Sequence, residues 1–155
     1  MSAFARCAVA LSVIALAVVS LPAGTPASAG PAWTPATVAL AFEWAIDVER
    51  TSRGLAPLVP DPTISGEAQL WSGGMALFGT LVHDHNFSAE IAAADPAWRA
   101  AGENVGEGPS PASVEAALMA SPEHRANILG DYTHMGVGAF VDGNGTVWVT
   151  ERFYR

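Results

Sequence analysis

The sequence contains no lysine, so its cationic side chains are seven arginines, set against fifteen acidic residues. A nucleic-acid-binding protein needs a basic patch to neutralise phosphates, and this charge balance argues against such a partner. The same balance disfavours attraction to an anionic membrane surface. We therefore expect no nucleic-acid partner for this chain.

Cysteine is nearly absent as well, and its single copy, Cys7, precedes an apolar run over 8–21. With Arg6 ahead of this run and small residues at 27–29 behind it, residues 1–29 are predicted to form a cleavable signal peptide. The run is shorter than the about 20 apolar residues of a membrane span, which disfavours the alternative of an uncleaved anchor. We therefore expect a secreted, monomeric single domain over 30–155, without disulfides or a stable membrane span, in which six arginines face fifteen acidic residues for a net charge of −9.

Three common hydrolase signatures are missing from the sequence. There is no HExxH zinc motif, no GxSxG nucleophile elbow, and no cysteine after position 7 that could act as a nucleophile. Serines do occur near the histidine-bearing segments, but Ser121 precedes a proline and is better explained as a helix N-cap. These absences argue against a HExxH metalloprotease, an α/β-hydrolase with a nucleophile elbow and a cysteine hydrolase.

Apolar periodicity and capping residues predict helices first and strands last. Thr34 and Ser110 are candidate N-caps, and Gly54 stands where a left-handed helix end belongs. The predicted helices cover 35–53, 63–82, 111–120 and 121–129, with one helical turn near 88–93 in the otherwise irregular segment 86–101. A β-hairpin is predicted from strands over 135–141 and 146–153 around a turn at 142–145. This order favours an α+β fold in which helices cover an antiparallel sheet.

The predicted buried faces follow the same spacing. The first helix is expected to bury Val38, Phe42, Ala45 and Val48, and the second to bury Ile64, Ala68, Trp71, Met75, Phe78 and Val82. The pair of glycines at 73–74 weakens the second helix and suggests that another backbone approaches it closely. In the last strand, odd-numbered positions such as Val149 are expected on one face and even-numbered ones such as Arg152 on the other.

Histidines and one glutamate mark the candidate site. His83 lies in LVHDHNF at the end of the second predicted helix, and His85 follows two residues later. Glu103 lies in GENVG, read as a glycine-rich turn, and His124 is the third residue of a short helix, where the neutral imidazole is favoured. Neutral imidazole and carboxylate are suited to divalent-metal binding or acid–base chemistry.

These segments together resemble the CAP superfamily of cysteine-rich secretory proteins, insect-venom antigen five and plant pathogenesis-related proteins, in its bacterial form. The resemblance covers nearly all of 30–155 and rests on the spacing of its motifs: Glu49-Arg50, His83-Asp84, Gly102-Glu103-Asn104, Ser121-Pro122, His124-Arg125 and Gly136-Val137-Gly138. It implies a three-layer α-β-α sandwich in which helices flank the antiparallel sheet.

The resemblance also implies a cleft lined by two His and two Glu that can hold a divalent metal, often Zn²⁺. Matched by motif, the first histidine is His83, with His85 as its rival, and the second is His124. The first glutamate is Glu103, and Glu115 is the residue available as the second. His83 and His124 are thus the expected metal ligands.

Three functions remain open at this point. The first is an extracellular binding module whose ligand is a lipid, a sterol or another small molecule, as the resemblance implies. The second is a zinc-dependent hydrolase or peptidase in which Glu103 is the general base that activates water. The third is a surface-acting interaction protein whose cleft is vestigial.

Overall fold

The computed structural model describes residues 33–155, so the predicted signal peptide lies outside the described residues. The helices and strands of this part of the chain follow in the order α1 (Pro35–Thr51), β1 (Val59–Pro60), α2 (Pro62–Phe78), α3 (Phe87–Ala94), β2 (Ala101–Gly108), α4 (Pro111–Ala120), α5 (Pro122–Ile128), β3 (His134–Val141) and β4 (Val147–Tyr154). The mixture of helices and strands confirms the predicted α+β class. No helix among residues 33–155 is long and apolar enough to cross a membrane.

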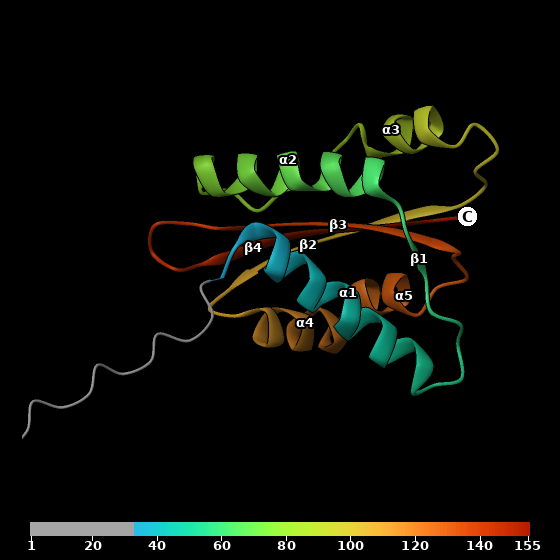
Figure 1. Cartoon of the computed structure of the whole chain (residues 1–155), viewed down its shortest axis with the longest axis horizontal. Coiled ribbons are helices and arrows are strands. Elements are labelled where there is room, and N and C mark those ends of the chain that lie inside the picture. The colour runs from blue at the N-terminus through green and yellow to red at the C-terminus, as the bar shows by residue number, and fades with distance from the viewer. Residues whose placement is uncertain (1–32) are drawn as a thin grey trace, which may run out of the picture. The chain divides into compact units, whose positions relative to one another are not determined.

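The elements form three layers around one sheet (Figure 1). The strand order is β1-β3-β4-β2, with antiparallel pairing throughout except for the two-residue β1, which runs parallel to β3. Helices α2 and α3 lie on one face of the sheet, and α1, α4 and α5 lie on the other. This arrangement confirms the predicted α-β-α sandwich.

The hairpin of β3 and β4 follows the sequence prediction to within one residue at each end. Its turn is held by Asp142, whose Oδ1 accepts the backbone N–H groups of Asn144 and Thr146, and by Gly145, whose φ of 83° suits glycine. Val149 belongs to the core beneath α1, while Arg152 contacts acidic groups on the α2 and α3 side. The predicted alternation of the two faces of β4 is therefore confirmed.

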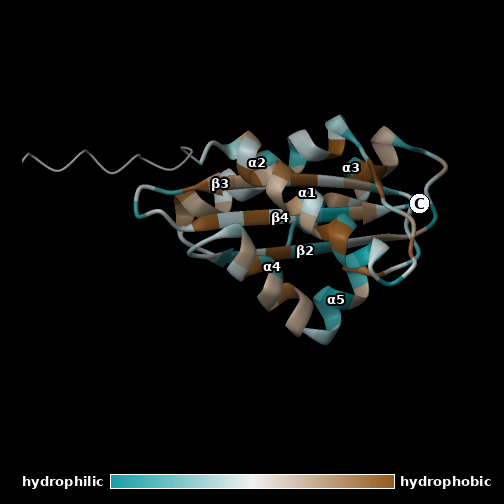
Figure 2. Ribbon diagram, turned by 60° about the horizontal axis from the view of Figure 1, so that its bottom comes forward, coloured by the Kyte–Doolittle hydropathy of each residue, from teal (hydrophilic) through white to brown (hydrophobic). Residues whose placement is uncertain are grey.

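Most of the buried apolar side chains lie between the sheet and helices α1, α4 and α5. Figure 2 shows hydrophobic residues along β3 and β4, where α1 crosses them. The predicted N-cap Thr34 is confirmed by a reciprocal pair of hydrogen bonds with Thr37. The predicted stripe of α1 is only half right, because Ile46 and Arg50 are buried in place of Ala45 and Val48.

Helix α2 ends four residues earlier than predicted. Gly79 adopts the left-handed conformation and donates its N–H to the carbonyl of Met75, so the helix stops at Phe78. Phe78 and Val82, predicted to be buried, are instead 80% and 41% exposed. The close backbone approach suggested by the glycines at 73–74 occurs elsewhere, since a Cβ at Gly138 of β3 would lie 2.0 Å from the backbone nitrogen of Gln69.

Strand β2 was not predicted, because its glycines resemble a turn. In the structure these glycines make room for the neighbouring helices. A Cβ at Gly102 would lie 2.6 Å from Asn127, and one at Gly106 would lie 2.7 Å from Val114. The segment that carries Glu103 is therefore an edge strand packed against α4 and α5, and the reading of GENVG as a turn was wrong.

Candidate functional site

His83 lies in the loop that follows α2, and not at the end of the helix as predicted. The loop folds back onto α2 because the indole N–H of Trp71 donates to the carbonyl of Val82 at 2.9 Å. The side chain of His83 is 52% exposed, while the next residue, Asp84, is buried. The loop thus presents one imidazole to solvent from a fixed position.

The carboxylate of Glu103 fixes that position from the sheet. Its Oε1 accepts the backbone N–H of Asp84 at 2.9 Å and lies 3.0 Å from Nδ1 of His83. Its Oε2 accepts Nε–H of Arg152 at 3.0 Å, and the side chain is 1% exposed. A histidine held through Nδ1 keeps Nε2 as the nitrogen that can meet a ligand, so Glu103 orients His83.

Arg152 is the functional residue that sequence reasoning missed. It is fully buried on β4 and pairs with Glu103, with Asp84 at 2.6 Å, and with Glu90 of α3. One guanidinium therefore joins the sheet, the His83 loop and α3. The sequence pattern of β4 could have indicated this role. Arg152 shares a strand face with the aromatic Trp148, and a buried arginine needs acidic partners.

His124 approaches from the opposite layer. It is the third residue of α5, as predicted, and its ring is half-buried. Burial lowers its pKa, and the positive charge that His83 can carry lowers it further, while Glu123 acts in the opposite direction. His124 is therefore a neutral imidazole at neutral pH, within electrostatic range of His83.

Two asparagines attach α5 to the edge strand beside these histidines. Asn104 donates from Nδ2 to the backbone carbonyl of His124 at 3.2 Å, and Asn127 donates to Oδ1 of Asn104 at 2.9 Å. Asn104 therefore bridges β2 and α5. The site is thus assembled across the β2 edge of the sheet from both helical layers.

Glu103 contacts His83, and His124 lies within electrostatic range of His83, whereas the contacts of Glu115 lie elsewhere. Glu115 is buried on α4 and interacts with Glu151. Glu151 pairs in register with Asn104, so it lies on the face of the sheet opposite Glu103, which pairs with Arg152. His85 is exposed, and no hydrogen bond reaches its ring within residues 33–155.

Few side chains at this edge of the sheet are free to act as metal ligands. Within the described chain, no group of three or more His, Cys, Asp or Glu side chains is arranged to hold a metal ion. His83 and His124 are the two residues that would bind one, because both oxygens of Glu103 already accept hydrogen bonds. Two imidazoles fit a loosely held cation that keeps water ligands, and they do not fit a closed structural zinc site, which needs four protein ligands.

An apolar pocket lies between α2 and the loop that leads to His83. It encloses about 170 Å³ and is lined by Trp71, Gly74, Met75, Phe78, Thr80 and Val82. Its polar groups are already used, since the indole N–H of Trp71 donates to Val82 and the hydroxyl of Thr80 donates to Phe78 at 3.3 Å. The pocket therefore suits hydrocarbon, and its lining ends at Val82, the residue before His83.

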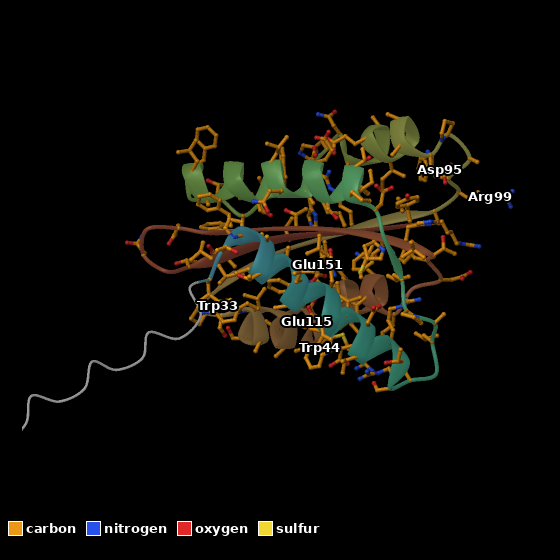
Figure 3. All side chains as sticks on the ribbon, in the orientation of Figure 1. Trp33, Trp44, Asp95, Arg99, Glu115 and Glu151 are labelled. Atoms are coloured by element: carbon orange, nitrogen blue, oxygen red, sulfur yellow. The ribbon has the colours of Figure 1, made fainter. Side chains whose placement is uncertain are left out.

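A second apolar pocket, of about 210 Å³, lies on the other layer between α1 and α4. Trp33 and Trp44 line it, and Figure 3 shows both on the α1 side of the molecule. It touches neither histidine. It therefore provides an internal comparison for the pocket beside Trp71.

The sequence profile of the cysteine-rich secretory protein family, or CAP family, matches residues 45–153. The chain belongs to the CAP family. The match includes His83, Glu103, Glu115 and His124, so all the residues carried over by motif lie inside the CAP domain. No curated protein sequence matches the chain.

Three solved structures share the fold of this CAP domain. An outer surface protein of Borrelia burgdorferi superposes with a TM-score of 0.68 at 17% identity, over 77% of this chain and 92% of its own. An extracellular protein of Bacillus anthracis that contains an SCP domain gives 0.68 at 20% identity, over 78% of this chain. A cysteine-rich secretory protein of Staphylococcus aureus gives 0.63 at 16% identity, over 80% of this chain.

The last two relatives are longer proteins, of which this chain covers 41% and 40%. At these identities the likeness concerns the fold alone. What the site does must therefore be argued from its own residues.

Proposed function

We propose that this CAP-domain protein is an extracellular binding module for a small amphipathic ligand such as a lipid or sterol. The hydrocarbon part of the ligand would occupy the pocket beside Trp71, and its polar end would meet His83 and His124. One observation carries this proposal: the polar side chains of the apolar pocket are already hydrogen-bonded, and its last lining residue, Val82, directly precedes His83, which Glu103 holds by Nδ1. Such a combination of apolar wall and few polar groups is typical of small-molecule sites.

An extracellular location is part of the same proposal. It is supported by the signal-peptide pattern over 1–29 and by the secretory character of the family. The Bacillus relative is likewise described as an extracellular protein. A cleavage assay that finds Gly30 at the N-terminus of exported protein would support it, and retention of the full chain inside the cell would contradict it.

Ligand binding can be tested by tryptophan fluorescence, because Trp71 lies in the proposed pocket and Trp44 lines the other one. The purified protein would be titrated with a long-chain fatty acid and, separately, with cholesterol. We expect saturable quenching that Trp71→Ala abolishes and Trp44→Ala leaves intact. Quenching that only Trp44→Ala removes would place the ligand between α1 and α4 and overturn the proposal.

A divalent cation at His83 and His124 is the second candidate function. Glu103 holds His83 by Nδ1, and burial keeps His124 neutral, so both rings can offer a lone pair. A bound Zn²⁺ would supply Lewis-acid polarisation of an oxygen-containing ligand. Under this proposal Glu103 orients His83. The hydrolase hypothesis instead requires Glu103 to take a proton from water, although its oxygens already contact Asp84, His83 and Arg152.

The hydrolase and the surface-acting hypotheses are separated from binding by two variants. A hydrolase predicts chelator-sensitive turnover that Glu103→Gln destroys. A protein that acts through its surface alone predicts that the His83→Ala/His124→Ala double variant keeps full activity. The binding module predicts retained hydrocarbon uptake in that double variant, with weaker binding of ligands that carry an acidic end.

A further inference from the structure

Two buried carboxyl groups lie against one another on the face of the sheet opposite Glu103. Glu115 comes from α4 and Glu151 from β4, and Figure 3 shows both between the sheet and the α1–α4 layer. Glu151 is 0% exposed and Glu115 is 5% exposed. Both oxygens of Glu115 and Oε1 of Glu151 are buried without a hydrogen-bond donor among the described residues.

Such an arrangement is costly if both groups are ionised. Two carboxylates can only accept hydrogen bonds, so three of their four oxygens would be left buried with no donor. When one carboxyl is protonated, its O–H donates to the other group and the contact becomes a hydrogen bond. The geometry alone therefore favours one retained proton.

The neighbouring elements provide no cation that could replace this proton. From β2, Asn104 donates Nδ2 to Oε2 of Glu151 at 3.0 Å, but it is uncharged. From α1, Glu49 adds a negative charge near Glu115, and the guanidinium of Arg50 is engaged by the carbonyls of Ala56, Ile128 and Gly130.

The remaining elements add no counter-charge either. Helix α5 contributes the backbone carbonyl of His124 through Asn104, and the residue of β3 in register with Glu151 is the apolar Val137. Helix α4 itself carries no ionisable side chain other than Glu115.

We propose that Glu115 and Glu151 share a proton that fastens α4 to the sheet, and that loss of this proton at rising pH weakens the fold at this contact. The shared proton makes the contact between α4 and β4 a pH-sensitive element of the CAP domain. It lies on the face of the sheet opposite Glu103, and Asn104 joins it to the backbone of His124.

The acidities of the two groups agree with this geometry. Burial raises the pKa of Glu115 to about 7, with a further rise from Glu49 and an opposing effect of the contact with Glu151. Burial and the charge of Glu115 raise the pKa of Glu151 well above its ordinary value, while the hydrogen bond from Asn104 lowers it. The folded state therefore holds a proton that the unfolded chain releases near its ordinary pKa of 4.5.

The sign of the effect on stability follows from this difference. Because the folded pKa is raised, the contribution is fully present below about pH 4.5 and is lost as the pH rises through about 7. Between these two pH values, the equilibrium constant for unfolding rises about tenfold per pH unit for each proton that only the folded state retains. The ionisation of His124 has the opposite dependence, so the pair must be isolated by comparing variants.

The test is denaturant unfolding of the protein and of Glu151→Gln from pH 5 to pH 8. Glutamine keeps the shape of the side chain, accepts from Asn104 and donates to Glu115, without a proton to lose. We expect the unfolding constant of the unchanged protein, divided by that of Glu151→Gln, to rise at least tenfold between pH 5 and pH 8. Glu107→Gln, at an exposed position of β2, is the matched control and should give a constant ratio.

Two further measurements keep the proposal open to refutation if Glu151→Gln does not fold. Glu115→Gln should give the same rising ratio. At pH 6 the infrared spectrum should show the carbonyl band of a protonated carboxyl, which either substitution removes. A constant ratio in both variants, or no such band, would overturn the proposal. Restoration of stability at pH 8 by Ca²⁺ alone would also overturn it, because the pair would then be a cation site.

Discussion

Replacing Arg152 by methionine is expected to destabilise the protein more than any other change to the site. The guanidinium is fully buried and pairs with three carboxylates, from Glu103, Asp84 and Glu90. Methionine fills similar space but provides no positive charge and no hydrogen-bond donor. The variant therefore keeps the packing of β4 while removing the guanidinium that joins the three carboxylates.

The expected loss of folding stability follows from the burial of the carboxylates that lose their partner. Glu103 is 1% exposed and Asp84 is 4% exposed, whereas Glu90 is 28% exposed and can turn toward water. Removing one partner of a buried ion pair costs about 3–5 kcal/mol. This is a large share of the roughly 5–15 kcal/mol of a typical domain. Glu103 keeps the N–H of Asp84, which limits the loss to that range.

Urea unfolding at pH 7 and at pH 4 would measure this loss. Carboxyl groups that lack a cation are protonated more readily, so the cost of Arg152→Met should shrink at pH 4. The matched control is Arg155→Met, because Arg155 pairs with Asp131 at the surface, where a salt bridge contributes about 0–1 kcal/mol. A cost below about 1 kcal/mol for Arg152→Met, or one that does not change with pH, would refute the reasoning.

Two other predictions concern the metal ligands and the packing of α2. Calorimetric titration with Zn²⁺ should show one weak site per chain that the His83→Ala/His124→Ala double variant loses; equal binding by both proteins would exclude these histidines as ligands. Gly138→Ala should destabilise the fold by about 1–3 kcal/mol or more in thermal unfolding, because its Cβ would lie 2.0 Å from the backbone nitrogen of Gln69. Gly66→Ala, on the exposed face of α2 with nothing within 4 Å, should instead stabilise by up to about 1 kcal/mol, and the reverse order would contradict this account of the packing.

Local patterns were sufficient to predict much of the architecture. Caps at Thr34 and Ser110 and the β-turn at 142–145 gave the starts of α1 and α4 and the final hairpin, because these signals act over a few residues. The motifs around Glu103 and His124 also identified the CAP family. The alternation of residues along β4 correctly predicted that Val149 and Arg152 lie on opposite faces of the sheet.

The sequence by itself thus determined the fold class and the family, and it marked His83, Glu103 and His124 as the candidate site. Only the tertiary structure decided what each carboxyl and each glycine does. Gly102 lies in a strand that pairs with β4 and has no side chain because Asn127 occupies the space that a Cβ would need. Glu115 lies apart from His83 because α4 covers the face of the sheet opposite Glu103. The physical reason is that burial and pairing depend on partners 20 or more residues away, as with Arg152 and Glu103, which no local pattern records.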